Sequence, residues 1–152
     1  MKNLCAAGLL STLLFTVFPS FSQVEPQINQ QIPDKPFLFS SLPDKFECNL
    51  AELEKLFSIS PPQKFNLKLN NAFRLDGVLA EKFIRSDRLT SLNIRLDNYA
   101  SALFTISRTI EKDITTYTGR IVSIKHGDLL LLRKENGKYY FIKQELKLVM
   151  VE

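Results

Sequence analysis

Apolar and polar side chains alternate with a period of two over most of the chain from Lys64 onward. This period puts successive side chains on opposite faces of a β-strand that is buried on one side. Candidate strands lie at 64–69, 73–83, 92–97, 102–106, 117–124, 129–134, 138–143 and 146–150. Gly77 could mark a bulge within its strand, and a tight turn is predicted at His126-Gly127-Asp128. We expect six to eight antiparallel strands, arranged as a compact sandwich or a partly open barrel.

One short helix is predicted ahead of these strands. Asn49 suits the N-cap, and Glu52 follows three residues later, as in a capping box. The residues that share its apolar face are Leu50, Leu53, Leu56 and Phe57. The segment 58–62, which contains two prolines, ends it. A helix this short is stable only when its apolar face packs on another element.

The strongest local signal is the dipeptide Asn136-Gly137, because both residues tolerate the positive φ that a type I′ turn requires. Such a two-residue turn fixes the register of its hairpin, so that the numbers of facing residues add to 273. The expected pairs are Glu135 with Lys138, Lys134 with Tyr139, Arg133 with Tyr140, Leu132 with Phe141, and Leu131 with Ile142.

Basic and aromatic side chains interleave around this hairpin. The candidate binding residues are Lys125, Arg133, Lys134, Tyr139, Tyr140 and Lys143. Such a set could contact sugars or an anionic partner. The favoured interpretation is structural: the register sets a cation opposite a ring on each face of the hairpin, so folding alone explains the pattern.

The N-terminus has the three parts of a secretory signal peptide. Lys2 precedes the apolar run 4–18, and Ser20 and Ser22 occupy the small-residue positions of a cleavage site. The sequence therefore predicts a signal peptide at 1–22 and export to the periplasm or the exterior, with no membrane span after cleavage. A Pro- and Gln-rich extended lead-in follows at 23–44, with an apolar cluster at 37–39 that could dock on the domain. A single β-rich domain is expected at 45–152.

Composition fits this organisation. Removing residues 1–22 from the 152 leaves 130, enough for one domain with a core. Hydrophobic residues make up 45% and charged residues 24%, which are ordinary values for a globular chain. The excess positive charge of the mature chain lies after Lys112, and we interpret it as a solvated strand face. Cys48 is the only cysteine expected in the mature chain, and we expect it to be a small buried hydrophobe.

Residue types needed for catalysis are sparse. His126 is the only histidine, so the sequence predicts no metal site, and a dyad of His126 with Cys48 has little support. The glycines are isolated, which argues against a phosphate-cradling loop and a bound cofactor. Acidic pairs could be drawn from Asp76, Glu81, Asp87 and Asp97, but any exposed strand supplies such pairs.

The function that these patterns favour is an exported, non-enzymatic binding or accessory domain. Its expected partner is an envelope or secreted protein, or an anionic glycan; export makes nucleic acid a poor candidate. The alternative is a separate-chain inhibitor, or a prodomain-like partner, of an exported enzyme, with the lead-in inserted into a cleft.

Export gives the first testable prediction. The mature protein purified from its native host should begin at Gln23, because Ser20 and Ser22 fit the small-residue pockets of signal peptidase. Intact mass spectrometry checks this. A full-length chain recovered from the membrane fraction would contradict it.

Overall fold

The computed structural model describes residues 35–146. The predicted signal peptide, the lead-in before Lys35 and the predicted strand after Leu146 lie outside these residues. The described elements are β1 (Lys45–Cys48), α1 (Leu50–Ser58), β2 (Gln63–Lys68), β3 (Arg74–Ser86), β4 (Leu89–Leu96), β5 (Leu103–Glu111), β6 (Ile114–Val122), β7 (Asp128–Glu135) and β8 (Lys138–Glu145).

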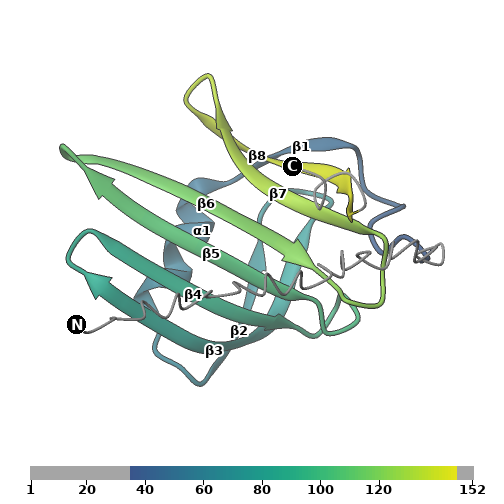
Figure 1. Ribbon diagram of the computed structural model, residues 1–152, viewed down its shortest axis with the longest axis horizontal. Helices are drawn as coiled ribbons and strands as arrows, with labels where there is room; N and C mark the ends of the chain where they lie inside the picture. The colour runs from purple at the N-terminus through teal and green to yellow at the C-terminus, as the bar shows by residue number, and fades with distance from the viewer. Residues whose placement is uncertain (1–34, 147–152) are drawn as a thin grey trace, which may run out of the picture. The chain divides into compact units, whose positions relative to one another are not determined.

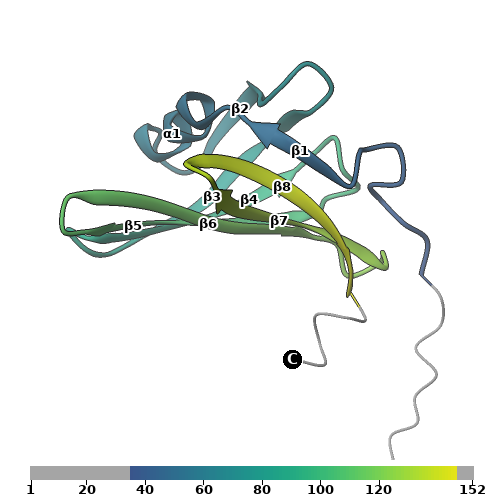
Figure 2. The same cartoon turned by 90° about the horizontal axis from the view of Figure 1, so that it is seen from above.

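The strands form one antiparallel sheet in the order β1-β8-β7-β6-β5-β4-β3-β2 (Figure 1). From β2 to β8 each strand pairs with the next one in the chain. β1 pairs with β8 at the far edge. The sheet curls into a half-barrel with α1 on its concave side (Figure 2). The predicted mainly β class is thus confirmed, with eight strands and the partly open barrel of the two expected forms.

Helix α1 connects the two edge strands, and the curl brings the ends of this connection close together. In a flat sheet of eight strands the edges would lie about 34 Å apart, and the nine helical residues span about 14 Å, so the few residues beside the helix would have to be fully stretched to join them. The curl brings the edges together at one point. The N–H of Asn49 donates to the carbonyl of Leu69 (3.0 Å), and the side-chain amide of Asn70 donates to the carbonyl of Glu47 (3.1 Å).

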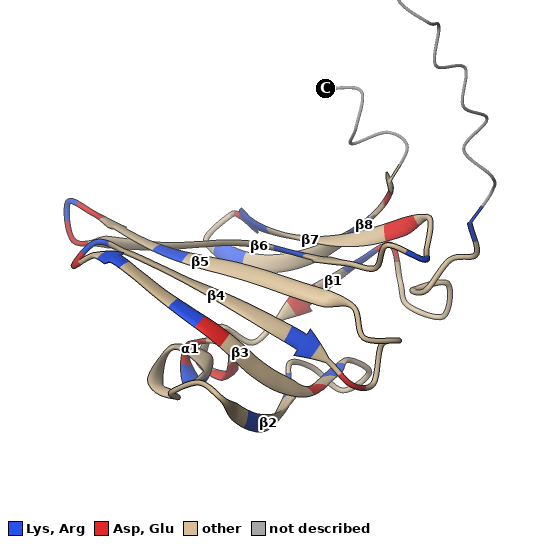
Figure 3. Ribbon diagram, turned by 60° about the horizontal axis from the view of Figure 1, so that its bottom comes forward, with Lys and Arg blue, Asp and Glu red and all other residues tan. Residues whose placement is uncertain are grey.

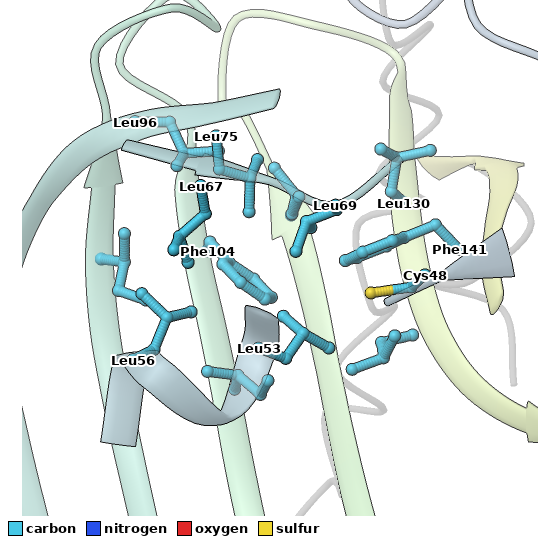
Figure 4. Packing of buried hydrophobic residues seen from close by; sticks show 14 of the residues in the cluster. Cys48, Leu53, Leu56, Leu67, Leu69, Leu75, Leu96, Phe104, Leu130 and Phe141 are labelled. Atoms are coloured by element: carbon cyan, nitrogen blue, oxygen red, sulfur yellow. The ribbon is translucent and has the colours of Figure 1, made fainter. Parts of the chain in front are cut away.

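The core fills the space between α1 and the concave face (Figure 4). α1 contributes Leu53, Leu56 and Phe57 as its buried residues. The sheet contributes alternate residues, as the period of two predicted. The fully buried ones are Leu75, Leu79, Leu92, Ile94, Leu96, Phe104, Ile106, Ile121, Leu130 and Phe141. At about 1.5–3 kcal/mol for each large buried side chain, this packing is the main stabilising term.

A series of aromatic side chains in contact connects the two edges of the sheet with neighbouring parts of the core. Phe46 on β1 lies 4.9 Å from Phe73, which precedes β3, measured between ring centroids. Phe73 in turn lies 5.4 Å from Phe141 on β8 and 5.5 Å from Tyr99. These tilted and edge-on arrangements are favourable for aromatic pairs. The half-barrel is therefore held closed by aromatic contacts as well as by α1.

Both termini of the helix are satisfied by side chains, but the predicted capping box is wrong, because Glu52 pairs with Lys55 and the Asn49 N–H donates to Leu69. The Asn49 carboxamide oxygen accepts from the N–H of Ala51 (3.0 Å), which confirms the predicted N-cap. At the other end, the Lys82 ammonium donates to the carbonyls of Phe57 (2.6 Å) and Ile59 (3.3 Å). A cation is favourable there because helix C-termini carry partial negative charge.

The described part of the lead-in, residues 35–44, is docked on the domain. The buried carboxylate of Asp128 accepts from the N–H groups of Leu38 (2.7 Å) and Phe39 (2.8 Å). Phe39 is fully buried, and Lys143 donates to the carbonyls of Phe39 and Leu42. The apolar cluster at 37–39, which the sequence suggested could dock, is thus docked on the domain.

Three other local predictions are wrong. A strand, β1, precedes the helix; its four residues are too few to show a period and form a strand by pairing with β8. Gly77 is no bulge, since the irregularities lie between Leu79 and Glu81 and between Ile84 and Ser86. A Cβ on Gly77 would instead lie 2.3 Å from the carbonyl oxygen of Arg95. The turn predicted at residues 126–128 instead runs from Ser123 to His126, and Asp128 is the first residue of β7.

The predicted hairpin register is confirmed. All five predicted pairs, from Glu135 with Lys138 to Leu131 with Ile142, are present, and the same register continues to Asp128 with Glu145. Asn136 and Gly137 both have positive φ, 49° and 80°, as a type I′ turn requires.

Substitution at the turn tests this backbone requirement. Gly137→Val should destabilise the domain by about 1–2 kcal/mol, because a β-branched residue resists positive φ. Urea unfolding measures the change. Gly137→Asn is the matched control, since Asn tolerates this conformation and a new Cβ meets no atom within 4 Å. Equal losses for the two variants would contradict the assignment.

Candidate functional site

The six sequence-predicted binding residues do not share one face. Facing residues of the hairpin point to the same side and successive residues to opposite sides. Tyr139 therefore points into the core, where it is buried, while Tyr140 is half-buried on the outer face. Arg133 faces Tyr140 on the outer side, and Lys134 faces Tyr139 on the inner side.

The other two predicted residues lie elsewhere. Lys125 is an exposed residue of the turn before β7. Lys143 is largely covered, because its ammonium group holds the docked segment through the carbonyl of Leu42 (2.7 Å) and an ion pair with Asp44 (3.2 Å). Only Arg133 and Lys134 of the six are exposed neighbours on one strand.

The predicted cation–ring contacts are half confirmed. The Lys134 ammonium lies 5.9 Å from the ring centroid of Tyr139, as expected. Tyr140 has a different partner from the one predicted. Lys45 of β1 lies 4.6 Å from its centroid, because β1 pairs with β8 beside it. The sequence did not predict β1, so it could not supply this cation.

Charge around the hairpin is largely paired. Lys45 forms an ion pair with Glu135, and Lys138 forms one with Glu47 (3.0 Å). Lysines and arginines alternate with acidic residues along the sheet and its turns, rather than gathering over one strand (Figure 3). Within residues 35–146, Arg133 and Lys134 have no ion-pair partner.

The sheet opens next to these two cations. β6 has nine residues and β7 has eight, yet they pair only from Gly119 with Leu132 to Val122 with Leu129. Beyond this point β6 continues beside β5, while the β7–β8 hairpin turns away toward its tip (Figure 1). We call the gap between Thr115–Thr118 of β6 and Arg133–Lys134 of β7 the fork.

The backbone groups that face the fork follow from strand alternation. Glu135 and Lys138 form the hydrogen-bonded pair next to the turn, so the backbone N–H and carbonyl groups of odd-numbered β7 residues point toward β8. Those of Lys134 therefore point toward the fork. By the same rule Thr115 and Tyr117 face it from β6. The Tyr139 hydroxyl accepts from the N–H of Tyr117 (3.1 Å) and takes the place of the missing strand partner. Among the described residues, the ladder leaves Thr115 and Lys134 without a cross-strand partner here.

The fork contains an open groove of about 450 Å³. It is lined by Thr116, Tyr117, Thr118, Gly119, Leu131, Leu132, Arg133 and Lys134. These described lining residues include two cations and no carboxylate. The groove therefore combines strand edges, hydroxyl groups and positive charge.

A buried tyrosine forms the inner wall of the fork. The Tyr117 hydroxyl donates to the carboxylate of Glu54 on α1 (2.9 Å), and its ring meets that of Tyr139 edge-on at 5.6 Å. Burial, with a further contribution from the Glu54 carboxylate, raises the pKa of Tyr117 to about 12. The phenol is thus neutral at physiological pH and fixes the wall to the helix.

A second open groove of about 500 Å³ lies where the sheet edges meet. It is lined by Glu47, Cys48, Asn49, Leu50, Leu69, Asn70, Asn71, Gly137, Lys138 and Tyr139. Its charged groups, Glu47 and Lys138, are paired with each other. Two of its asparagines, Asn49 and Asn70, already serve the helix cap and the edge contacts. Most of its polar groups thus have structural partners, so the fork is the stronger candidate site.

The considered catalytic residues are not brought together. Cys48 faces Tyr139 near the hairpin tip, while His126 precedes Asp128 at the other end of β7, about 20 Å away along the strand. His126 is half-buried rather than exposed, and its ring bonds to the Ser123 hydroxyl (2.8 Å). Asp87 and Asp97 flank opposite ends of β4. Asp76 and Glu81 accept from the asparagines Asn66 and Asn93.

The sequence did not reveal the fork, because nothing in a strand pattern states where a ladder ends. One signal was present. Thr115, Thr116 and Thr118 surround Tyr117, so both faces of this part of β6 are polar except for one ring. Such a segment buries little apolar area against a neighbouring layer.

The buried thiol gives a pH-dependent prediction. Burial raises the pKa of Cys48 from 9.0 to about 12, so the folded protein should contain about a thousandfold less thiolate at pH 8 than the unfolded chain. Alkylation by iodoacetamide should be correspondingly slow until denaturant is added. Because the thiol holds its proton to higher pH in the folded state than in the unfolded chain, its contribution to the free energy of unfolding is complete below pH 9 and is lost as pH rises toward 12. Rapid alkylation without denaturant would contradict the burial.

No three metal-ligating side chains cluster within the described range 35–146. In that same range, α1 is too short to cross a membrane. Comparison with known proteins finds no matching family model, no matching curated protein and no matching solved structure.

Proposed function

We propose that this chain is an exported, non-enzymatic accessory domain that binds another envelope or secreted protein. The observation that carries the proposal is the fork, an open groove in which strand edges are flanked by Arg133 and Lys134. Free strand edges pair readily with extended segments of other proteins. Export is proposed from the signal-peptide pattern of residues 1–22.

Binding is favoured over catalysis by the state of the reactive groups. Cys48 is buried with a raised pKa, and His126 lies at the other end of β7. An activated nucleophile needs a base within hydrogen-bond reach. Beside the fork, Lys45 pairs with Glu135, Lys138 pairs with Glu47, and the Lys134 ammonium lies over the ring of Tyr139. These contacts suit recognition.

A protein partner is favoured over an anionic glycan. Glycan recognition commonly uses rings and cations on one surface, whereas Tyr139 and Tyr140 point to opposite sides of the hairpin and Tyr139 is buried. Backbone groups in a groove are the feature that an extended peptide can use.

The accessory role is also favoured over the separate-chain inhibitor. Residues 35–44 of the lead-in are held by Asp128 and Lys143, so they are not available to enter the cleft of an enzyme. An inhibitor would have to use residues before Lys35, which lie outside the described range.

Site-specific photo-crosslinking tests the proposal. A benzoylphenylalanine placed at Thr118, an exposed residue in the fork, should give one discrete adduct with an exported protein in the native host. The adduct should disappear when excess unlabelled protein is added, because a specific site saturates.

The matched control carries the same probe at Arg95, which is exposed on β4 away from the fork. It should give no such adduct. Identical adducts from both positions, or none from Thr118, would refute binding at the fork.

A further inference from the structure

The true edges of this sheet are poorly suited to strand addition. β1 has only four residues, and Lys45 and Glu47 on it are held in ion pairs. β2 follows Pro61-Pro62 and carries Lys64 and Lys68, both exposed. Short strands, proline and lysine are the devices by which proteins protect sheet edges. The fork has unpaired edge backbone inside a groove and no proline, and although Lys134 lies on it, this lysine has no ion-pair partner among the described residues.

The fork offers a defined set of backbone partners. Thr115 and Lys134 each present an N–H and a carbonyl, and Tyr117 presents its carbonyl, its N–H being held by Tyr139. An extended peptide lying along the β6 edge would match Thr115 and Tyr117 at the two-residue spacing of a strand, and one lying along the β7 edge would reach Lys134. Thr116 and Thr118 line the groove beside them with small polar side chains.

The charge of the fork selects the sequence of such a peptide. Its described lining contains Arg133 and Lys134 but no carboxylate. The nearest acid on β7, Glu135, is engaged by Lys45, and Glu54 accepts from the Tyr117 hydroxyl. Arg133 and Lys134 are therefore available to an incoming anion, and complementary charge at a groove favours encounter as well as register.

We infer that the fork binds an acidic extended segment of the partner by strand addition, with backbone hydrogen bonds to β6 or β7 and carboxylates beside Arg133 and Lys134. This inference rests on the proposed function and names the chemistry of its partner. The backbone pairing supplies affinity, and the two cations supply selectivity.

Peptide binding to the whole mature protein tests the inference. The probe is a peptide of about six residues, an ordinary strand length, with Glu at its two central positions and Val at the others; successive residues point to opposite faces, so one carboxylate can lie beside each cation. Its dissociation constant is measured by fluorescence anisotropy at low and at moderate salt. The matching Lys–Val peptide should bind at least about tenfold more weakly because of like-charge repulsion.

Backbone methylation separates strand addition from simple charge attraction. Two versions of the Glu–Val peptide carry N-methyl groups on alternate residues, one on the odd-numbered positions and one on the even-numbered positions. Only one set of N–H groups faces a given strand edge, so one version should lose at least about tenfold in affinity and the other should lose less. If both methylated versions bind the protein as tightly as the unmethylated peptide does, strand addition is overturned.

Protein variants locate the site. The double substitution R133E and K134E should lower the affinity at least about tenfold, while K64E and K68E, which makes the same charge change on β2, should leave it unchanged. Thermal unfolding verifies that both variants fold. Since the methylated peptides are used with the unaltered protein, a poorly folded variant would not decide the outcome.

The possible failures are distinguishable. Binding of a sulfated glycan fragment that exceeds binding of the Glu–Val peptide, with sensitivity to R133E and K134E, would overturn the peptide assignment. A Thr118 adduct together with no peptide binding would overturn strand addition but leave the accessory function standing. Peptide binding that R133E and K134E do not weaken would place the site elsewhere and overturn the inference.

Discussion

The fold depends on the short connection between the two edges of its sheet. Helix α1 and its flanking residues must join β1 to β2, although seven strand spacings separate these edges in the order of the sheet. A flat sheet would leave that connection fully stretched, whereas the curled sheet brings Asn49 within hydrogen-bond distance of Leu69. The curl creates the concave face, which the apolar face of α1 and the ring of Phe73 then fill.

The same constraint accounts for the fork. Pairing with β1 draws the β7–β8 hairpin toward the edge that closes the half-barrel, while β5 and β6 continue outward together. Tyr139 follows the hairpin and places its hydroxyl where the ladder would have continued, on the N–H of Tyr117. The opening in the sheet is thus stabilised by a specific hydrogen bond and by the packing of two rings.

Local chemistry in the sequence predicted local structure well. The period of two gave the buried faces, Asn49 gave the start of the helix, and Asn136-Gly137 gave the register of the last hairpin. What the sequence could not give depends on contacts between distant segments. β1 exists because β8 lies beside it, and the cation over Tyr140 comes from β1. The candidate site was only partly predicted: Arg133 and Lys134 were named, but the threonines around Tyr117 are the one sign in the sequence of where the β6–β7 ladder ends, and they do not fix that point.

The openness of the fork is the central claim, and hydrogen exchange of single amides measures it directly. The amides of Thr115 and Lys134, which face the fork, should exchange rapidly, and those of Thr116 and Arg133, which face β5 and β8, should be protected. This alternation within adjacent residues requires intact strands beside an open gap. Equal protection of all four amides would show that β6 and β7 are paired there, and would contradict the account.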